Sequence, residues 1–126
     1  MYLRFTTKKT DCDSSRKQGL LVAAHELRDE ADLTVEEHRV IRRAVSWFND
    51  NLKHPDCLEE SGNRRALSWF KPEARIPLRH MWCLVEIFRV HDISTEVHKT
   101  ADPGGIIYED QWQIVAKPHR GIRTPW

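Results

Sequence analysis

The sequence predicts an α+β fold: a small, mostly antiparallel sheet covered on one face by three to four helices. Apolar and polar residues alternate at the start of the chain and again near its end, a pattern typical of half-buried strands. Between these stretches, apolar residues recur at helical spacing. The 126 residues, 40% of them hydrophobic, suffice for one core, so we expect a single domain over residues 1–126.

The first predicted strand covers residues 2–7, because Leu3 and Phe5 share one face and Arg4 and Thr6 share the other. A two-stranded ribbon is only marginally stable alone. We therefore expect this strand to lie beside the strands predicted at the C-terminal end of the chain.

Two helices follow this strand. Residues 18–31 carry apolar side chains at helical spacing. A second helix begins after Thr34, because Thr34 and Glu37 form a capping-box pattern in which each side chain binds the backbone amide of the other residue. Pro55 requires this helix to end before it.

Two near-copies of one pentapeptide occur in the chain, at 44–48 and 66–70. We interpret both as ends of amphipathic helices that present an aromatic pair to the core. A sharper hypothesis makes one tryptophan of each pair exposed, which predicts a partner-binding patch of Trp47, Trp69 and Phe70.

A further helix is predicted from Pro77 to His91, with proline in its first turn. Seven of the eight residues from Met81 to Phe88 are apolar. A helix that is apolar nearly all round is buried on more than one side, so we expect Trp82, Cys83 and Phe88 in the core.

The last part of the chain predicts strands at 94–100, 106–108 and 112–116. Residues 101–105 form a turn, since proline presets one backbone angle and the two glycines accept positive ones. Residues 53–65, rich in charge and turn formers, predict a flexible internal loop. Residues 119–126 predict a basic C-terminal tail.

Composition excludes several classes of protein. Twenty Lys and Arg oppose nineteen Asp and Glu, a net charge of +1, so no strong field attracts nucleic acid or membranes. No apolar run approaches the roughly 20 residues that a membrane span needs, so we expect no membrane association. Three widely spaced cysteines and the absence of a secretory signal favour a cytoplasmic location.

No motif predicts catalysis, so we consider the chain more likely not to be an enzyme. The sequence lacks a nucleophile elbow, a phosphate-binding glycine loop and a dinucleotide fingerprint. His25 and Asp29 share a helix face, but a metal site needs a third ligand. The neighbours Glu37–His38 and His91–Asp92 point about 100° apart on a helix. We therefore predict no catalytic residues, no metal and no cofactor.

Several short segments resemble small bacterial proteins to which no activity is assigned. The resemblance covers most of the chain and implies a bacterial, cytoplasmic origin without implying a function. It rests on Met1–Phe5, Gly19–Leu20, Glu26–Arg28, Ser68–Lys71, Pro103–Gly104, Tyr108–Asp110, Gln113–Ala116 and Pro118.

Our first functional hypothesis is a non-enzymatic, accessory or regulatory protein that binds another protein or a second copy of itself. Five tryptophans are several times the usual number, and aromatic side chains on a near-neutral surface favour protein interfaces. The contact would use the predicted Trp47, Trp69 and Phe70 patch or a free sheet edge.

Nucleic-acid binding is the alternative hypothesis. Cations that follow phosphates beside aromatics that stack on bases are typical of single-strand binders. An isoelectric point near 7.8 counts against a dedicated binder. The residues expected to cluster are Arg4, Lys99, Trp112, Lys117, Arg120 and Arg123.

Overall fold

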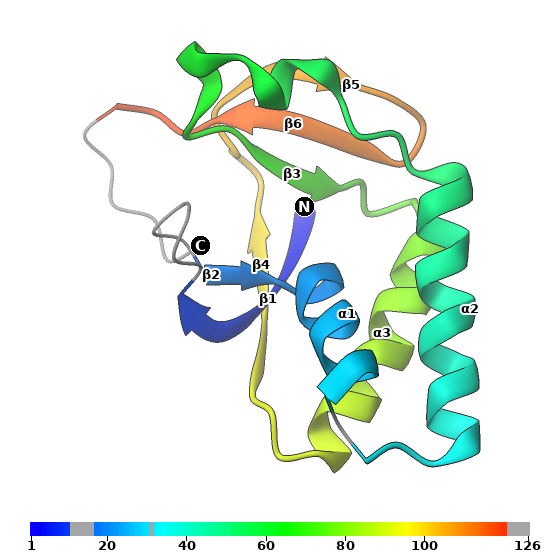
Figure 1. Ribbon diagram of the computed structural model, residues 1–126. Helices are drawn as coiled ribbons and strands as arrows, with labels where there is room; N and C mark the ends of the chain where they lie inside the picture. The colour runs from blue at the N-terminus through cyan, green and yellow to red at the C-terminus, as the bar shows by residue number, and fades with distance from the viewer. Residues whose placement is uncertain (11–16, 31, 121–126) are drawn as a thin grey trace.

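A computed structural model describes residues 1–10, 17–30 and 32–120 and confirms the predicted α+β class (Figure 1). Three α-helices lie together on one side of a mostly antiparallel sheet. The elements, in chain order, are β1 (Tyr2–Thr10), β2 (Lys17–Gly19), α1 (Leu20–Glu30), α2 (Val35–Asn51), the 3₁₀ helices η1 (Asp56–Glu59) and η2 (Ser61–Asn63), β3 (Leu67–Phe70), α3 (Arg75–Val90), β4 (Thr95–Thr100), β5 (Gly105–Glu109) and β6 (Gln113–Lys117).

Strand β1 contacts three other strands. It pairs antiparallel with β4 from Tyr2 to Thr7. On its opposite edge it pairs with β3 at Leu3 and with β2 at Thr6 and Thr10. Strand β3 then pairs with β6, and β6 pairs with β5. The expectation that the N-terminal strand lies beside a C-terminal strand is therefore confirmed.

Because successive side chains of a strand point to opposite faces of the sheet, the strands contribute to two separate cores. Phe5 is only 3% exposed and packs with apolar residues of all three helices and with Phe70. The neighbouring Trp69 points the other way, as successive strand residues do, and is 1% exposed. It packs with Leu67, Ile114 and Ala116 in a second core that lies within β3 and β6.

The capping box at the start of α2 is confirmed. The Glu37 amide donates to the Thr34 hydroxyl at 3.1 Å, and the Thr34 amide donates to the Glu37 carboxylate at 2.9 Å. The side chains of Thr34 and Glu37 thus provide hydrogen-bond partners for two backbone amides at the start of the helix. Helix α2 ends at Asn51, before Pro55, as expected.

The prediction of a helical end at 66–70 is wrong. These residues form strand β3, although they nearly repeat the α2 segment 44–48. The physical reason is tertiary: Leu67 to Phe70 pair with β6 on one side, and Phe70 lies opposite Leu3 of β1 on the other. Strand pairing outweighs a weak local preference.

The prediction that Trp82 and Cys83 belong to the core is also wrong, whereas that for Phe88 is confirmed. Phe88 is 1% exposed, but Trp82 is 46% exposed and Cys83 is exposed. Within the described residues, α3 is buried along one face only. The other face has no covering element there, so an apolar sequence leaves apolar side chains at the surface.

Two segments differ from what the sequence predicts. Gln18 and Gly19, predicted as the start of the first helix, instead belong to strand β2, which pairs with the far end of β1, so α1 begins only at Leu20. The segment 53–65 contains η1 and η2, and its backbone is bound to the sheet where Gln113 Nε2 donates to the Lys53 carbonyl at 2.7 Å. Its flexibility stays a prediction.

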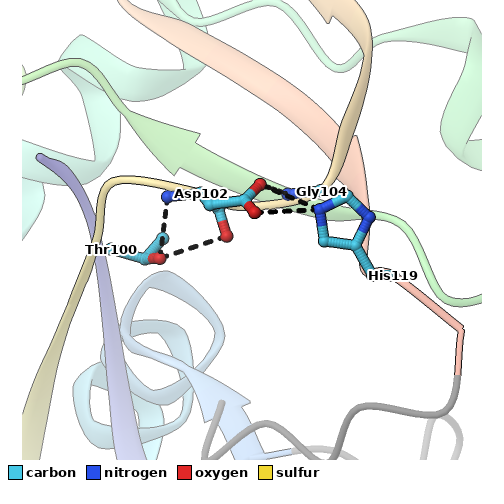
Figure 2. A network of polar contacts seen from close by, with 4 residues as sticks. All are labelled: Thr100, Asp102, Gly104 and His119. Carbon is cyan, nitrogen blue, oxygen red and sulfur yellow. Dashed lines mark hydrogen bonds and ion pairs between the residues drawn. The ribbon is translucent and has the colours of Figure 1, made fainter.

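The turn between β4 and β5 is held by a small polar network (Figure 2). The Thr100 hydroxyl donates to the Asp102 carbonyl and accepts from the Asp102 amide, both at 3.1 Å. The Asp102 carboxylate accepts from the Gly104 amide at 3.2 Å and contacts His119 at 3.0 Å. The network joins the predicted turn to the segment that follows β6.

Gly104 should tolerate no side chain. Its φ of +111° is unfavourable for other residues, and a Cβ there would collide with the Lys117 carbonyl and lie 2.9 Å from Pro118 Cα. Gly104→Ala should lower the free energy of unfolding by about 2 kcal/mol or more. Urea denaturation measures this. Gly105→Ala is the matched control, since a Cβ there meets nothing within 4 Å, and it should cost less than about 1 kcal/mol.

The two faces of α3 should respond differently to truncation. Phe88→Ala removes a buried ring and should cost about 3–5 kcal/mol of unfolding free energy. Trp82→Ala should cost clearly less, because nearly half of its surface is already exposed. Denaturation midpoints of the two variants in urea measure the difference, and equal losses would contradict the one-sided burial of α3.

Candidate functional site

The outer face of α3 is the candidate contact surface, and it stands apart because apolar groups are exposed along a whole helix. Ile76 is 44% exposed, Trp82 46% and Val90 64%. The Trp82 ring rests edge-on against the Phe5 ring of β1, with centroids 5.2 Å apart, so its position is fixed by the core beneath it. The face consists of Arg75, Ile76, Arg79, Trp82, Cys83, Glu86, Arg89 and Val90.

Helical geometry arranges this face in rows. Ile76, Cys83 and Val90 are seven residues apart, so they lie one above another with a drift of about 20° per step. Arg79 and Glu86 form the neighbouring row, also seven residues apart. The opposite side of the helix packs in the core, and its buried residues include Met81, Leu84, Ile87 and Phe88.

The charges on this face are partly paired. Arg89 donates to Glu86 at 2.8 Å, and this bond lowers the pKa of the Glu86 carboxyl below its ordinary value. Arg75 and Arg79 lie nearer the helix N-terminus. The face thus carries Arg75 and Arg79 toward one end and the ion pair of Glu86 with Arg89 toward the other.

Trp47, one of the predicted contact residues, is half-buried in an aromatic cluster. Its ring centroid lies 5.4 Å from that of His80 on α3 and 5.7 Å from that of Trp112, just before β6. Burial lowers the pKa of His80, and the charges of Arg43 and Arg79 lower it further. The cluster packs two helices against the start of β6, so the Trp47 side chain has a structural role.

The predicted Trp47, Trp69 and Phe70 patch does not form. Trp69 and Phe70 are both buried, and their side chains belong to different cores on opposite faces of β3. Phe48, not Trp47, contacts Phe70, with centroids 6.1 Å apart. Among the tryptophans that the structure describes, the exposed one is Trp82.

Two residues of the nucleic-acid hypothesis, Trp112 and Lys117, lie at opposite ends of β6. Trp112 precedes β6 and packs on α2, whereas Lys117 ends β6, about 16 Å further along an extended strand. Arg4 and Lys99 lie on neighbouring strands, β1 and β4. Lys117 and Arg120 are exposed. Arg123 lies outside the described residues.

Several histidines contact carboxylates, which raises the question of acid–base chemistry. His119 Nε2 lies 3.0 Å from both Asp102 oxygens, but Figure 2 shows Thr100 bonded to the backbone of Asp102 rather than to His119. Glu37 contacts His91, the C-cap of α3, at 2.8 Å. Its pKa is lowered by the Thr34 amide and by His91. These contacts join separate elements of the fold.

His98, which is 7% exposed, is the most deeply buried histidine among the described residues. Its Nε2 lies 2.9 Å from the Thr6 hydroxyl, on the face of β1 opposite Phe5. Within the described ranges, no three His, Cys, Asp or Glu side chains are arranged to hold a metal ion.

Comparison of the chain with protein-family models, with curated proteins and with solved structures finds no match. In the described part of the chain, none of the helices has the length and apolar character required to span a bilayer.

Sequence reasoning missed the outer face of α3, although a signal was present. The sequence shows that Met81–Phe88 is apolar nearly all round, but it does not show which element covers the second face of this helix. The seven-residue spacing of Ile76, Cys83 and Val90 is visible in the sequence.

Stability should decrease as the pH falls through the range where His98 titrates. Burial lowers the pKa of His98 below its ordinary value of 6.5, Lys17 and Arg4 lower it further, and Glu96 opposes them. The unfolded chain therefore binds more protons, and the free energy of unfolding falls as the pH drops below about 6.5. His98→Gln, which retains a donor for Thr6, should weaken this dependence. Thermal unfolding between about pH 7 and pH 5 measures it, and an unchanged slope would contradict the assignment.

Proposed function

We propose that this protein is a non-enzymatic protein-interaction module and that the outer face of α3 is its contact surface. One observation carries the proposal: Trp82 is 46% exposed on a helix in which seven of the eight residues from Met81 to Phe88 are apolar. Large aromatic side chains supply much contact area and dominate the energetics of interfaces. A helix with this composition is expected to be covered on both sides.

A second copy of the chain is the partner that fits the charges best. In an antiparallel pairing of two α3 helices about a two-fold axis near Trp82 and Cys83, Arg79 of one copy faces Glu86 of the other. Ile76 then lies near Val90 of the second copy. Such a contact is isologous, because the same face serves both subunits.

Truncation of Trp82 should therefore weaken self-association. Trp82→Ala should raise the dimer dissociation constant about 30-fold, which corresponds to about 2 kcal/mol, since a central aromatic anchors the contact. Sedimentation velocity over a range of concentrations measures it. Ile107→Ala is the control, because Ile107 is 39% exposed on the edge strand β5 and lies outside the α3 face.

A charge exchange distinguishes the antiparallel arrangement from other contacts. Arg79→Glu and Glu86→Arg should each weaken the dimer, since each places like charges opposite one another. The double variant should restore much of the affinity. A protein that stays monomeric at about 100 μM would contradict self-association.

A further inference from the structure

A cavity of about 330 Å³ lies on the helix side of the sheet, beside the place where β1 and β3 diverge. Strands β1, β3 and β6 form its floor, and its other walls come from the first turn of α1, the last turns of α2, the interior side of α3 and the loop that contains η1. This volume is within the range of small-molecule sites, roughly 300–1,000 Å³. Native interiors otherwise have few voids larger than a water molecule.

Strand alternation decides which side chains form the floor of the cavity. Phe5 of β1 and Phe70 of β3 both belong to the core that packs against the helices, and their ring centroids lie 6.3 Å apart. Arg4 and Trp69 also border the cavity, but their side chains point to the opposite face of the sheet. We therefore assign those two side chains no part in binding, and the floor is formed by the two phenylalanine rings.

The walls above this floor are apolar as well. Leu20 of α1, Phe48 of α2 and Met81 of α3 line the cavity, and each is at most 5% exposed. Apart from Arg4, the titratable side chains among the described residues that line it are Lys53 and His54, and both are exposed. A charge that enters an apolar space without a partner is costly, so these walls favour an uncharged molecule.

One buried polar side chain borders this apolar space. Gln113 of β6 is 3% exposed, and it lies on the same face as Phe70 because the two residues are paired across the strands. Its Nε2 donates to the Lys53 carbonyl at 2.7 Å and to the Asp110 carboxylate at 3.3 Å, and these two acceptors fix the orientation of the amide. Its Oε1 accepts no hydrogen bond within the described ranges and is not fully enclosed, so a molecule in the cavity can reach it. An amide oxygen only accepts, so it selects a donor.

We infer that this cavity is a binding site for a small, uncharged aromatic molecule with one hydrogen-bond donor, of which a phenol is the simplest example. The ring packs against Phe5, Phe48 and Phe70, since aromatic rings pack well edge-on or offset against one another. The hydroxyl donates to Gln113 Oε1 and so gives that buried acceptor a partner. The site is separate from the proposed protein contact on α3, so either can hold without the other.

Binding of 4-methylphenol and of p-xylene tests the inference, because p-xylene has the same shape with a methyl group in place of the hydroxyl. The phenol should bind with a dissociation constant below about 0.1 mM, and p-xylene at least about tenfold more weakly. A cavity that selected by apolar area alone would prefer p-xylene. Titration followed by NMR measures both affinities, and the phenol should also shift the side-chain amide signal of Gln113. Equal affinities, tighter binding of p-xylene, no binding of the phenol, an unmoved Gln113 signal, or 4-methylbenzoate that binds as tightly as the phenol would each overturn the inference.

Matched variants locate the phenol within the cavity. Leu58→Trp fills the cavity from η1 and should abolish binding, whereas Val35→Trp adds the same ring at an exposed position outside the cavity and should have no effect. Gln113→Met removes the amide oxygen and should reverse the preference, so that p-xylene binds more tightly than 4-methylphenol. If Gln113→Met fails to fold because the Lys53 carbonyl loses its donor, the comparison of Leu58→Trp with Val35→Trp decides. Unchanged affinity for the phenol in Leu58→Trp would overturn the inference.

Discussion

The structure depends on the pairing of β1 with three strands, of which β3 and β4 come from distant parts of the chain. Its partner β4 is distant in sequence, since the paired residues lie between 88 positions (Thr7 with Thr95) and 98 positions (Tyr2 with Thr100) apart. Pairing of this kind requires a long loop to close, so it is stable only if the strands also bury apolar surface. Phe5 supplies that surface, since it contacts both Phe70 and Trp82.

The same strand explains why a cavity lies beside β1 and β3. Strands β1 and β3 share a single registered pair, Leu3 with Phe70, and beyond Thr6 the same edge of β1 pairs with β2 instead. Where two strands diverge, no ladder of side chains closes the space between them. The first turn of α1 and the loop after α2 form the remaining walls. The cavity is thus a consequence of how one edge of β1 is divided.

Short sequence motifs predicted those features of the fold that depend on interactions between neighbouring residues. The capping box of Thr34 and Glu37 located the start of α2, and the glycines at 104–105 located the turn after β4, because both depend on neighbouring residues alone. The pentapeptides at 44–48 and 66–70 show the opposite case. Nearly the same sequence is helix in α2 and strand in β3, since β3 is fixed by partners in β1 and β6. The five residues alone therefore do not determine whether the segment forms a helix or a strand.

Helix α3 illustrates why the candidate site was harder to predict than the fold. Apolar periodicity reports how many faces of a helix avoid water, but not which molecule covers each face. Within the described chain, the sheet and the other helices cover the face that contains Phe88, whereas the face that contains Trp82 is covered only in part, where Trp82 contacts Phe5. The stripe of Ile76, Cys83 and Val90 therefore has the apolar character of a buried surface, although these side chains are exposed in the single chain. A partner that covers it reconciles the composition of the helix with its position.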